Sequence, residues 1–282
     1  MIKKMLALAS YALVTGIVLL FSSCQQEENL SQENDQEEEA VIEMTSNGED
    51  ELEDALELAA RSEAAFSAGQ GGRVDWSLCA TVTWNKETHQ IIIDFGDGCV
   101  GPRGRIHRGK IIVTYSVASA DHFADKVITF ESYFVNDTQV TGAIEVRDIR
   151  VNSEENMQCS VRLVDLRIIF PNGRDITFNG KRIREWLAGF GDDEPSNNIF
   201  RITGSLEGVT SSGRLITQEI TEPVISDWSC ASSGFFARVS GKIEITRLSG
   251  FGVRKRIIFY GDGACDNVIL IITVRRIYEL AL

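Results

Sequence analysis

The fold class is indicated by short apolar runs that end in turn residues, as in residues 161–173, which read VRLVDLRIIFPNG. Runs rich in Val, Ile and aromatic residues favour strands, and Pro-Asn-Gly or Asn-Gly pairs such as Asn179-Gly180 favour tight turns. Similar runs continue through the chain: Gln90 to Phe95, Lys110 to Val117, Lys126 to Phe134, Gln139 to Val146, Phe200 to Leu206, Gly241 to Arg247, Arg256 to Tyr260 and Val268 to Val274.

We therefore expect an all-β, antiparallel, hairpin-rich sheet assembly over residues 73–282, either as one large sheet assembly or as two abutting ones. No long helical period follows Phe66, although the segment near Arg182 to Leu187 is predicted to make one short turn.

Repeated motifs predict two related halves, near residues 75–150 and 151–282. The segment 75–79, DWSLC, resembles 227–230, DWSC, and 96–99, GDGC, resembles 261–265, GDGAC. A further pair links 140–145, VTGAIE, with 202–207, ITGSLE. The spacing of these pairs favours duplicated halves over a short-period solenoid.

The six cysteines follow this symmetry. Each half pairs one cysteine after an Asp-Trp-Ser motif with one after a Gly-Asp-Gly turn, which predicts the disulfides Cys79–Cys99 and Cys230–Cys265. Each should contribute about 3 kcal/mol, mainly by restricting the unfolded chain. Cys159 is then left as a free, partly buried thiol. The three histidines are scattered, so we expect no metal and no cofactor.

One helix is predicted before the strands, over residues 49–68. Leu52, Leu56, Ala59 and Phe66 share one face, although Glu63 interrupts it. Ser46 or Asn47 is suited to cap the helix, and Glu49, Asp50 and Glu51 suit the positive end of the helix dipole. The apolar stripe is expected to dock on the β domain, or else on a partner helix.

The acidity of the chain is concentrated upstream. The formal charge is −13, and residues 25–57 contain 14 acidic side chains and no basic one. With Lys3 and Lys4 also set aside, the chain from Leu58 onward carries a charge of −1. Residues 24–48 are therefore interpreted as an extended acidic tether, and a nucleic-acid partner is not expected. The basic clusters 103–110 and 254–256 are interpreted as solvated faces.

The N-terminus predicts export and lipidation. Lys3 and Lys4 precede an apolar stretch that ends in Phe21-Ser22-Ser23-Cys24, which resembles a lipobox. Residues 1–23 are then a lipoprotein signal peptide, and Cys24 is the acylated residue that holds the protein at the outer membrane. The alternative is a plain secretory signal or an anchor helix. The run Gln25 to Glu28 favours the cell exterior, with a periplasm-facing protein as the alternative.

The lipobox and the repeated modules, with Phe178-Asn179-Gly180-Lys181-Arg182 and Ser240-Gly241-Lys242-Ile243 among them, resemble a family of Bacteroidota outer-membrane and surface lipoproteins. The resemblance covers most of the chain from Cys24 on. It implies an exported, lipid-tethered β domain, and it brings no catalytic or ligand-binding residues to carry over.

Two candidate sites remain. Arg182, Arg184, Glu185 and Trp186 are a possible surface for a glycan or protein ligand, or else they make internal cation–π and ion-pair contacts. The Gly-Asp-Gly turns have carboxylates for calcium, but turn formation already accounts for their residues.

Nothing in the chain matches a common hydrolase motif. We therefore expect a non-catalytic binding or structural lipoprotein. The alternatives are a glycan- or nutrient-capture accessory protein, or an envelope polymer hydrolase.

Overall fold

The structure is a computed structural model that describes residues 41–42, 44–65, 72–73, 80–101, 104–116, 125–192, 194–249, 252–273 and 277–281. The chain divides into two compact units, residues 1–49 and 50–282. In the first unit, the described residues are helical. The predicted signal peptide and Cys24 lie outside the described residues, so their roles stay predictions. No helix among the described residues is long and apolar enough to cross a membrane.

The second unit is mostly antiparallel β-sheet, as the sequence predicted. Its strands are β1 (Gly72–Arg73), β2 (Thr81–Asn85), β3 (Gln90–Asp94), β4 (Cys99–Val100), β5 (Ile106–Tyr115), β6 (Lys126–Val135), β7 (Thr138–Val151), β8 (Met157–Ile169), β9 (Asp175–Ala188), β10 (Ile199–Thr210), β11 (Leu215–Asp227), β12 (Arg238–Ser249), β13 (Gly252–Asp262), β14 (Val268–Ile272) and β15 (Ile277–Ala281). A short 3-10 helix (Pro195–Asn197) precedes β10, and helix α2 (Trp228–Ser232) precedes β12.

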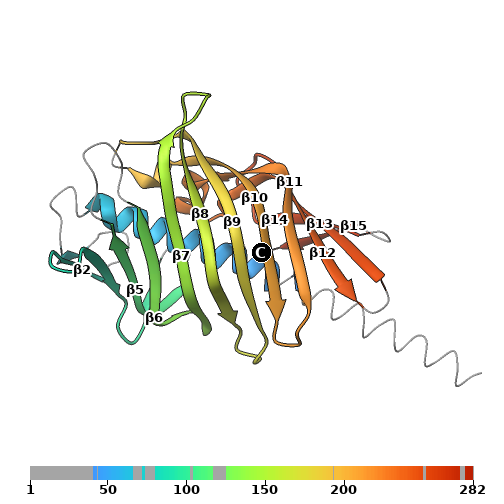
Figure 1. Ribbon diagram of the computed structural model, residues 1–282, viewed down its shortest axis with the longest axis horizontal. Helices are drawn as coiled ribbons and strands as arrows, with labels where there is room; N and C mark the ends of the chain where they lie inside the picture. Colours follow the sequence, from blue (N-terminus) through green and yellow to red (C-terminus); the bar gives the residue numbers. More distant parts are fainter. Residues whose placement is uncertain are drawn as a thin grey trace, which may run out of the picture. The chain divides into compact units, whose positions relative to one another are not determined.

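The strands form one continuous sheet in chain order, from β1 to β15, with β4 paired to β5 beside the main path (Figure 1). Each neighbouring pair is antiparallel, and the sheet is not closed. The short turn predicted near Arg182 to Leu187 is wrong, because these residues lie within the 14-residue strand β9. Arg184 and Glu185 are consecutive and place charges on both faces of the strand, so the sequence does not show the two-residue hydrophobic period of a half-buried strand.

Two of the repeated motifs mark matching irregularities in the sheet. Gly142 of β7 and Gly204 of β10 have φ values of 95° and 115°, and the strand register shifts at both places. A Cβ at Gly142 would lie 2.1 Å from the carbonyl oxygen of Asp165, and one at Gly204 would lie 2.5 Å from that of Lys181. Bulges of this kind bend strands and increase their twist. The repeat therefore encodes sheet curvature.

Helix α1 (44–65) begins earlier than the sequence predicted. Ser46 and Asn47, the predicted capping residues, lie inside the helix. From Asp50 to Ala59 every residue is buried, although half of them are acidic. The hydrophobic stripe seen in the sequence is therefore only one part of the buried surface of this helix.

The sheet must curl around this helix, because strands far apart in the sheet contact the same helical turn. Arg105, just before β5, pairs with Asp54 at 2.5 Å, and Arg238 of β12 pairs with Asp50. Seven strand steps separate β5 from β12, which in a flat sheet would be about 33 Å. The face that meets the helix carries alternating buried residues such as Ile111, Ile144, Leu163, Phe178 and Ile243.

The cysteines agree with the predicted arrangement where the structure describes them. Cys230 and Cys265 form a disulfide with a Cα–Cα distance of 5.3 Å, which is the pair predicted for the second half. Cys99 is also disulfide-bonded. Its predicted partner Cys79 lies outside the described residues, so that pairing stays a prediction. Cys159 is free and buried, and burial raises the pKa of its thiol to about 11.

Candidate functional site

The most elaborate polar site in the described residues lies where the sheet meets α1. We call it the helix-binding face and define it by the sheet and loop residues whose side chains bond to carboxylates of residues 50–63. These residues are Arg105, Lys126, Arg184, Ser226, Trp228 and Arg238.

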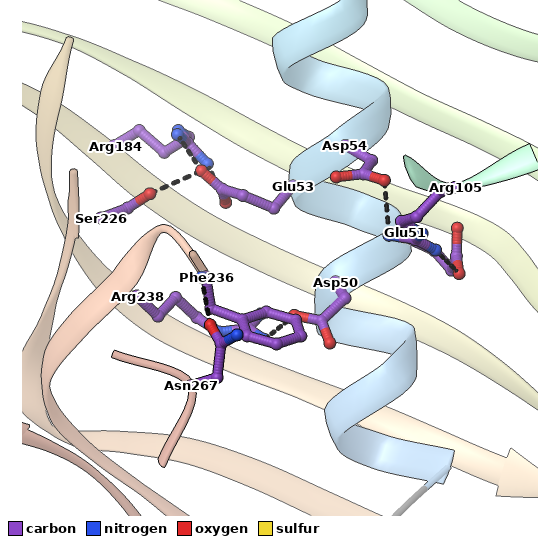
Figure 2. A network of polar contacts seen from close by, with 10 residues as sticks. All are labelled: Asp50, Glu51, Glu53, Asp54, Arg105, Arg184, Ser226, Phe236, Arg238 and Asn267. Atoms are coloured by element: carbon purple, nitrogen blue, oxygen red, sulfur yellow. Dashed lines mark hydrogen bonds and ion pairs between the residues drawn. The ribbon is translucent and has the colours of Figure 1, made fainter. Parts of the chain in front are cut away.

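The carboxylate of Glu53 is the centre of this face (Figure 2). The Arg184 guanidinium forms a bidentate pair with both of its oxygens, with Nη1 donating to Oε2 at 2.8 Å and Nη2 donating to Oε1 at 2.9 Å. Ser226 Oγ and Trp228 Nε1 also donate to Oε1, at 2.7 and 2.5 Å. One buried carboxylate thus accepts four hydrogen bonds from three side chains, which is near the full capacity of its lone pairs.

The electrostatics around Glu53 keep its carboxylate charged. Burial alone would raise the pKa of Glu53, but the charge of Arg184 and the hydrogen bonds from Arg184, Trp228 and Ser226 outweigh it and lower the pKa to about 2. The carboxylate is therefore ionised at neutral pH even though it is removed from water. Donors placed to compensate for desolvation in this way form a carboxylate-binding site.

Local sequence explains how Arg184 reaches this position. Side chains alternate along β9, so Arg184 points to the helix while Glu185 points away. The guanidinium lies 4.0 Å from the ring centroid of Phe200 and 5.5 Å from that of Trp228. The guanidinium thus lies over aromatic rings and also bonds to both carboxylate oxygens, a combination that arginine suits better than lysine.

Trp228 is positioned by the Asp-Trp-Ser-Cys motif. Asp227 caps α2 by accepting a hydrogen bond from the backbone N–H of Ser229 at 2.9 Å. Trp228 follows as the first residue of the helix and is 2% exposed. Cys230 then fixes α2 to the loop after β13 through its disulfide with Cys265. The motif that predicted the disulfide therefore also supplies one donor of the carboxylate pocket.

Further ion pairs extend the face along the helix. Arg105 bonds to both Glu51 and Asp54, which are three residues apart and so lie on the same side of the helix. Arg238 pairs with Asp50 and lies 5.0 Å from the ring centroid of Tyr260. The view in Figure 2 shows these carboxylates leaving the helix in different directions, each toward an arginine.

At the other end of the described helix, Lys126 of β6 bonds to both oxygens of Glu63, at 2.6 and 2.8 Å. Glu57 behaves differently from Glu53. Burial raises its pKa above the ordinary value, and the charge and hydrogen bond of Arg61 oppose that rise without overcoming it. The two glutamates differ in the direction of their pKa shift because more hydrogen-bond donors surround Glu53 than Glu57.

The predicted ligand surface at residues 182–186 is divided between the two faces of the sheet. Arg182, Arg184 and Trp186 lie toward the inside, where Arg182 bonds to Gln218 and Trp186 packs on Phe200. Arg184 makes the internal cation–π and ion-pair contacts that were the alternative interpretation of this cluster.

Glu185 lies on the opposite face, where it accepts hydrogen bonds from Arg201, Asn152 and Asn156. The hydrogen bond from Arg201 is the main reason that the pKa of Glu185 falls to about 2. The four residues of the predicted surface therefore do not form one site.

Several residues of the helix-binding face were missed or misinterpreted by sequence reasoning. Arg105 belongs to a cluster predicted to be solvated, yet its side chain is only 16% exposed and it is paired with two acids. Asp50 and Glu51 were assigned to the helix dipole, but their partners are arginines. The sequence held only an indirect sign of this face. The helix is rich in acidic residues, and strands such as β9 and β12 carry arginines that turn out to be buried.

Both Gly-Asp-Gly turns, at residues 96–98 and 261–263, lie within the described residues. In the first, Asp94 accepts a hydrogen bond from the backbone N–H of Gly96 at 2.9 Å, as a turn requires. Among the described residues there is no group of three or more His, Cys, Asp or Glu side chains that could hold a metal ion. Comparison of this chain with protein-family models, curated proteins and solved structures finds no match.

Proposed function

We propose that this protein is a non-catalytic binding lipoprotein, held at the outer membrane by acyl chains on Cys24 and facing the cell exterior. Its binding surface is the helix-binding face, and the ligand group that this face recognises is a carboxylate. The observation that carries the proposal is the Glu53 pocket, in which Arg184, Ser226 and Trp228 supply four hydrogen bonds to one buried carboxylate.

Energetics favour a recognition role for the ion pairs between α1 and the helix-binding face. Removing a charged pair from water costs several kcal/mol per ion, and an apolar pair of similar size is often as stable or more so. A sheet that only needed to hold a helix would do so with the leucines and alanines of α1. Pairing each acid with a buried arginine instead makes the contact selective for carboxylates at fixed positions.

The alternatives have less support. A glycan-capture protein uses exposed aromatic side chains on which sugars stack, but Trp228 and Phe200 are each 2% exposed and lie behind the Arg184–Glu53 pair. An envelope polymer hydrolase needs converging titratable groups in a concave site. The groups that converge at Glu53 are an arginine, a serine hydroxyl and an indole N–H, which suit charge recognition.

The experiment that tests carboxylate recognition is chemical rescue of Glu53→Ala in the full chain. The substitution removes a methylene and a carboxylate, which together correspond to acetate. We expect the variant to unfold at a lower temperature than the wild type, because Arg184 is left buried without its partner. Acetate at ten times its dissociation constant should restore about 1.4 kcal/mol of the free energy of unfolding.

The controls are sodium chloride at equal ionic strength and the variant Glu63→Ala, whose partner Lys126 bonds to a carboxylate that is 28% exposed. Acetate should not raise the unfolding temperature of Glu63→Ala or of the wild type by a comparable amount. Equal effects of acetate and chloride on Glu53→Ala would show that the pocket does not recognise a carboxylate.

A further inference from the structure

We infer that one end of the sheet in the second unit binds the surface of an anionic lipid bilayer. The contact is made by four exposed aliphatic side chains on the outer face of the sheet, which we call the outer row: Val209, Leu215, Leu248 and Val253. This contact lies beyond the proposed function, because it uses the outer face of the sheet and leaves the helix-binding face as it is.

The strand register places these four side chains next to one another. Val209 of β10 pairs with Leu215 of β11, and Leu248 of β12 pairs with Val253 of β13. The register between β11 and β12, continued by one residue, makes Leu215 and Leu248 neighbours as well. The outer row therefore crosses four adjacent strands, over a width of about 14 Å.

All four side chains lie on the solvent side of the sheet. In chain order, the residues of the outer row are 45, 38, 55 and 60% exposed, whereas Ile216 and Arg247 beside them are buried on the inner face. Single exposed aliphatic residues are common on protein surfaces, but a contiguous apolar patch is typical of a contact with a partner or a membrane.

The outer row follows the end of the sheet at which the β10–β11 and β12–β13 hairpins turn, since each of its members lies within two residues of a strand end. The turn at residues 211–213 has the small, uncharged sequence SSG, which suits the depth of lipid headgroups. Because the sheet curls around α1, its outer face is convex. Two convex faces cannot meet along a row that crosses four strands, whereas a flat bilayer that meets the sheet end-on can contact the whole row.

Charge identifies the lipid as anionic. At this end of β8 to β13, the described residues 167–177, 207–217, 246–249 and 252–256 contain seven basic side chains and two acidic ones, an excess of five positive charges. Some of these cations also pair within the sheet, as Arg167 does with Asp175.

The opposite end of the same sheet is acidic. Among the described residues of its loops, 152–156, 189–192, 194–198, 228–237 and 263–267, there are five acidic side chains and no basic one. An anionic surface therefore attracts the end that carries the outer row and repels the other end, which orients the sheet with its exposed aliphatic side chains toward the lipid.

The test measures flotation of the full chain with lipid vesicles. Cys24→Ala removes the predicted acylation site, and the outer-row variant adds Leu215→Ser and Leu248→Ser to that chain. With vesicles of phosphatidylglycerol and phosphatidylcholine, we expect the outer-row variant to bind about tenfold more weakly than Cys24→Ala, because two half-exposed leucines no longer leave water. Binding of Cys24→Ala should also fall with phosphatidylcholine alone and at high ionic strength.

The matched control adds Val151→Ser and Val268→Ser to the Cys24→Ala chain. These valines are 58 and 41% exposed and lie at the acidic end of the sheet, so this variant should float as Cys24→Ala does. Folding of each variant is checked by the unreactivity of the buried Cys159 thiol toward iodoacetamide. If the outer-row variant does not fold, Val209→Ser with Val253→Ser takes its place.

Three results would overturn the inference: no binding of Cys24→Ala to the anionic vesicles, equal binding of Cys24→Ala and the outer-row variant, or an equal loss of binding in the control. Analytical ultracentrifugation gives a fourth. If Cys24→Ala is a dimer and the outer-row variant is a monomer, the outer row is an interface between copies of this chain and the bilayer contact is refuted. Acetate rescue of Glu53→Ala tests the helix-binding face separately, because no residue of the outer row takes part in it.

Discussion

Acidification should expose the contribution of Glu53 to stability directly. Its pKa is lowered from 4.5 to about 2 in the folded protein, a difference that corresponds to about 3 kcal/mol at about 1.4 kcal/mol per pKa unit. Because the folded-state pKa is the lower one, the stabilisation is fully present above pH 4.5 and is lost as the pH falls toward 2. Replacing Glu53 by Gln should remove this pH-dependent contribution to the free energy of unfolding.

Other titratable groups also make the free energy of unfolding depend on pH. Glu57 has a raised pKa, so its contribution has the opposite sign: it is present below pH 4.5 and is lost as the pH rises through its folded-state pKa. Glu185, with a pKa of about 2, adds an acid-sensitive contribution to the wild type and to the variant alike. The comparison of the two chains therefore isolates Glu53, apart from the small repulsion that Glu53 exerts on Glu57.

The assay is urea unfolding followed by tryptophan fluorescence at pH 5, 4, 3 and 2.5. At pH 5 the variant should be less stable than the wild type by several kcal/mol, because Arg184 remains buried beside a neutral amide. The difference should shrink as the pH falls. Glu63→Gln, which changes a more exposed ion pair, serves as the control. If the free energy of unfolding of Glu53→Gln falls between pH 4.5 and 2.5 as steeply as that of the wild type, the charge assignment at this pocket is wrong.

Three further predictions concern the anchor and the cysteines. Cys24→Ala should abolish acyl labelling in cells, and labelling equal to that of the wild type would contradict lipidation. Replacing Gln25 to Glu28 by Ala should reduce digestion by protease added to intact cells, whereas unchanged digestion would leave the acidic run as a spacer. Non-reducing peptide mapping should recover Cys79–Cys99 with Cys230–Cys265, and Cys159, whose thiol is buried with a pKa of about 11, should react with iodoacetamide only after unfolding.

Sequence patterns predicted many of the strands because alternation and turn residues are local, but the Asn179-Gly180 pair, which favoured a turn, lies inside β9. The run at residues 126–134 corresponds to β6, and the strand register shifts at both Gly142 and Gly204. Strand β9 was missed in part because Arg182 and Arg184 occupy inward positions that are normally apolar. A pattern based on hydrophobicity assigns such residues to the surface.

The helix-binding face could not be predicted from the sequence for the same reason. Its paired charges lie between 51 and 188 residues apart in the chain, as with Arg105 and Asp54 or Arg238 and Asp50, and no local spacing joins them. The first acids of α1 were assigned to the helix dipole, although Asp50, Glu51 and Glu53 are buried against the sheet. Only the strand register, which places Arg184 on the inner face and Ser226 on the same face of β11, brings the donors together.

The repeated Asp-Trp-Ser-Cys motif connects the framework of the fold with the proposed site. Asp227 caps α2, Trp228 donates to Glu53, and Cys230 fixes α2 to the loop after β13. Asn267 in that loop accepts a hydrogen bond from the backbone N–H of Phe236 at 3.0 Å, which holds the two loops together a second time. A donor that must meet a buried carboxylate has little freedom of position, and a disulfide two residues away supplies that rigidity. This explains why the tryptophan and the cysteine occur in one motif: the covalent link positions the indole N–H that recognises the acid.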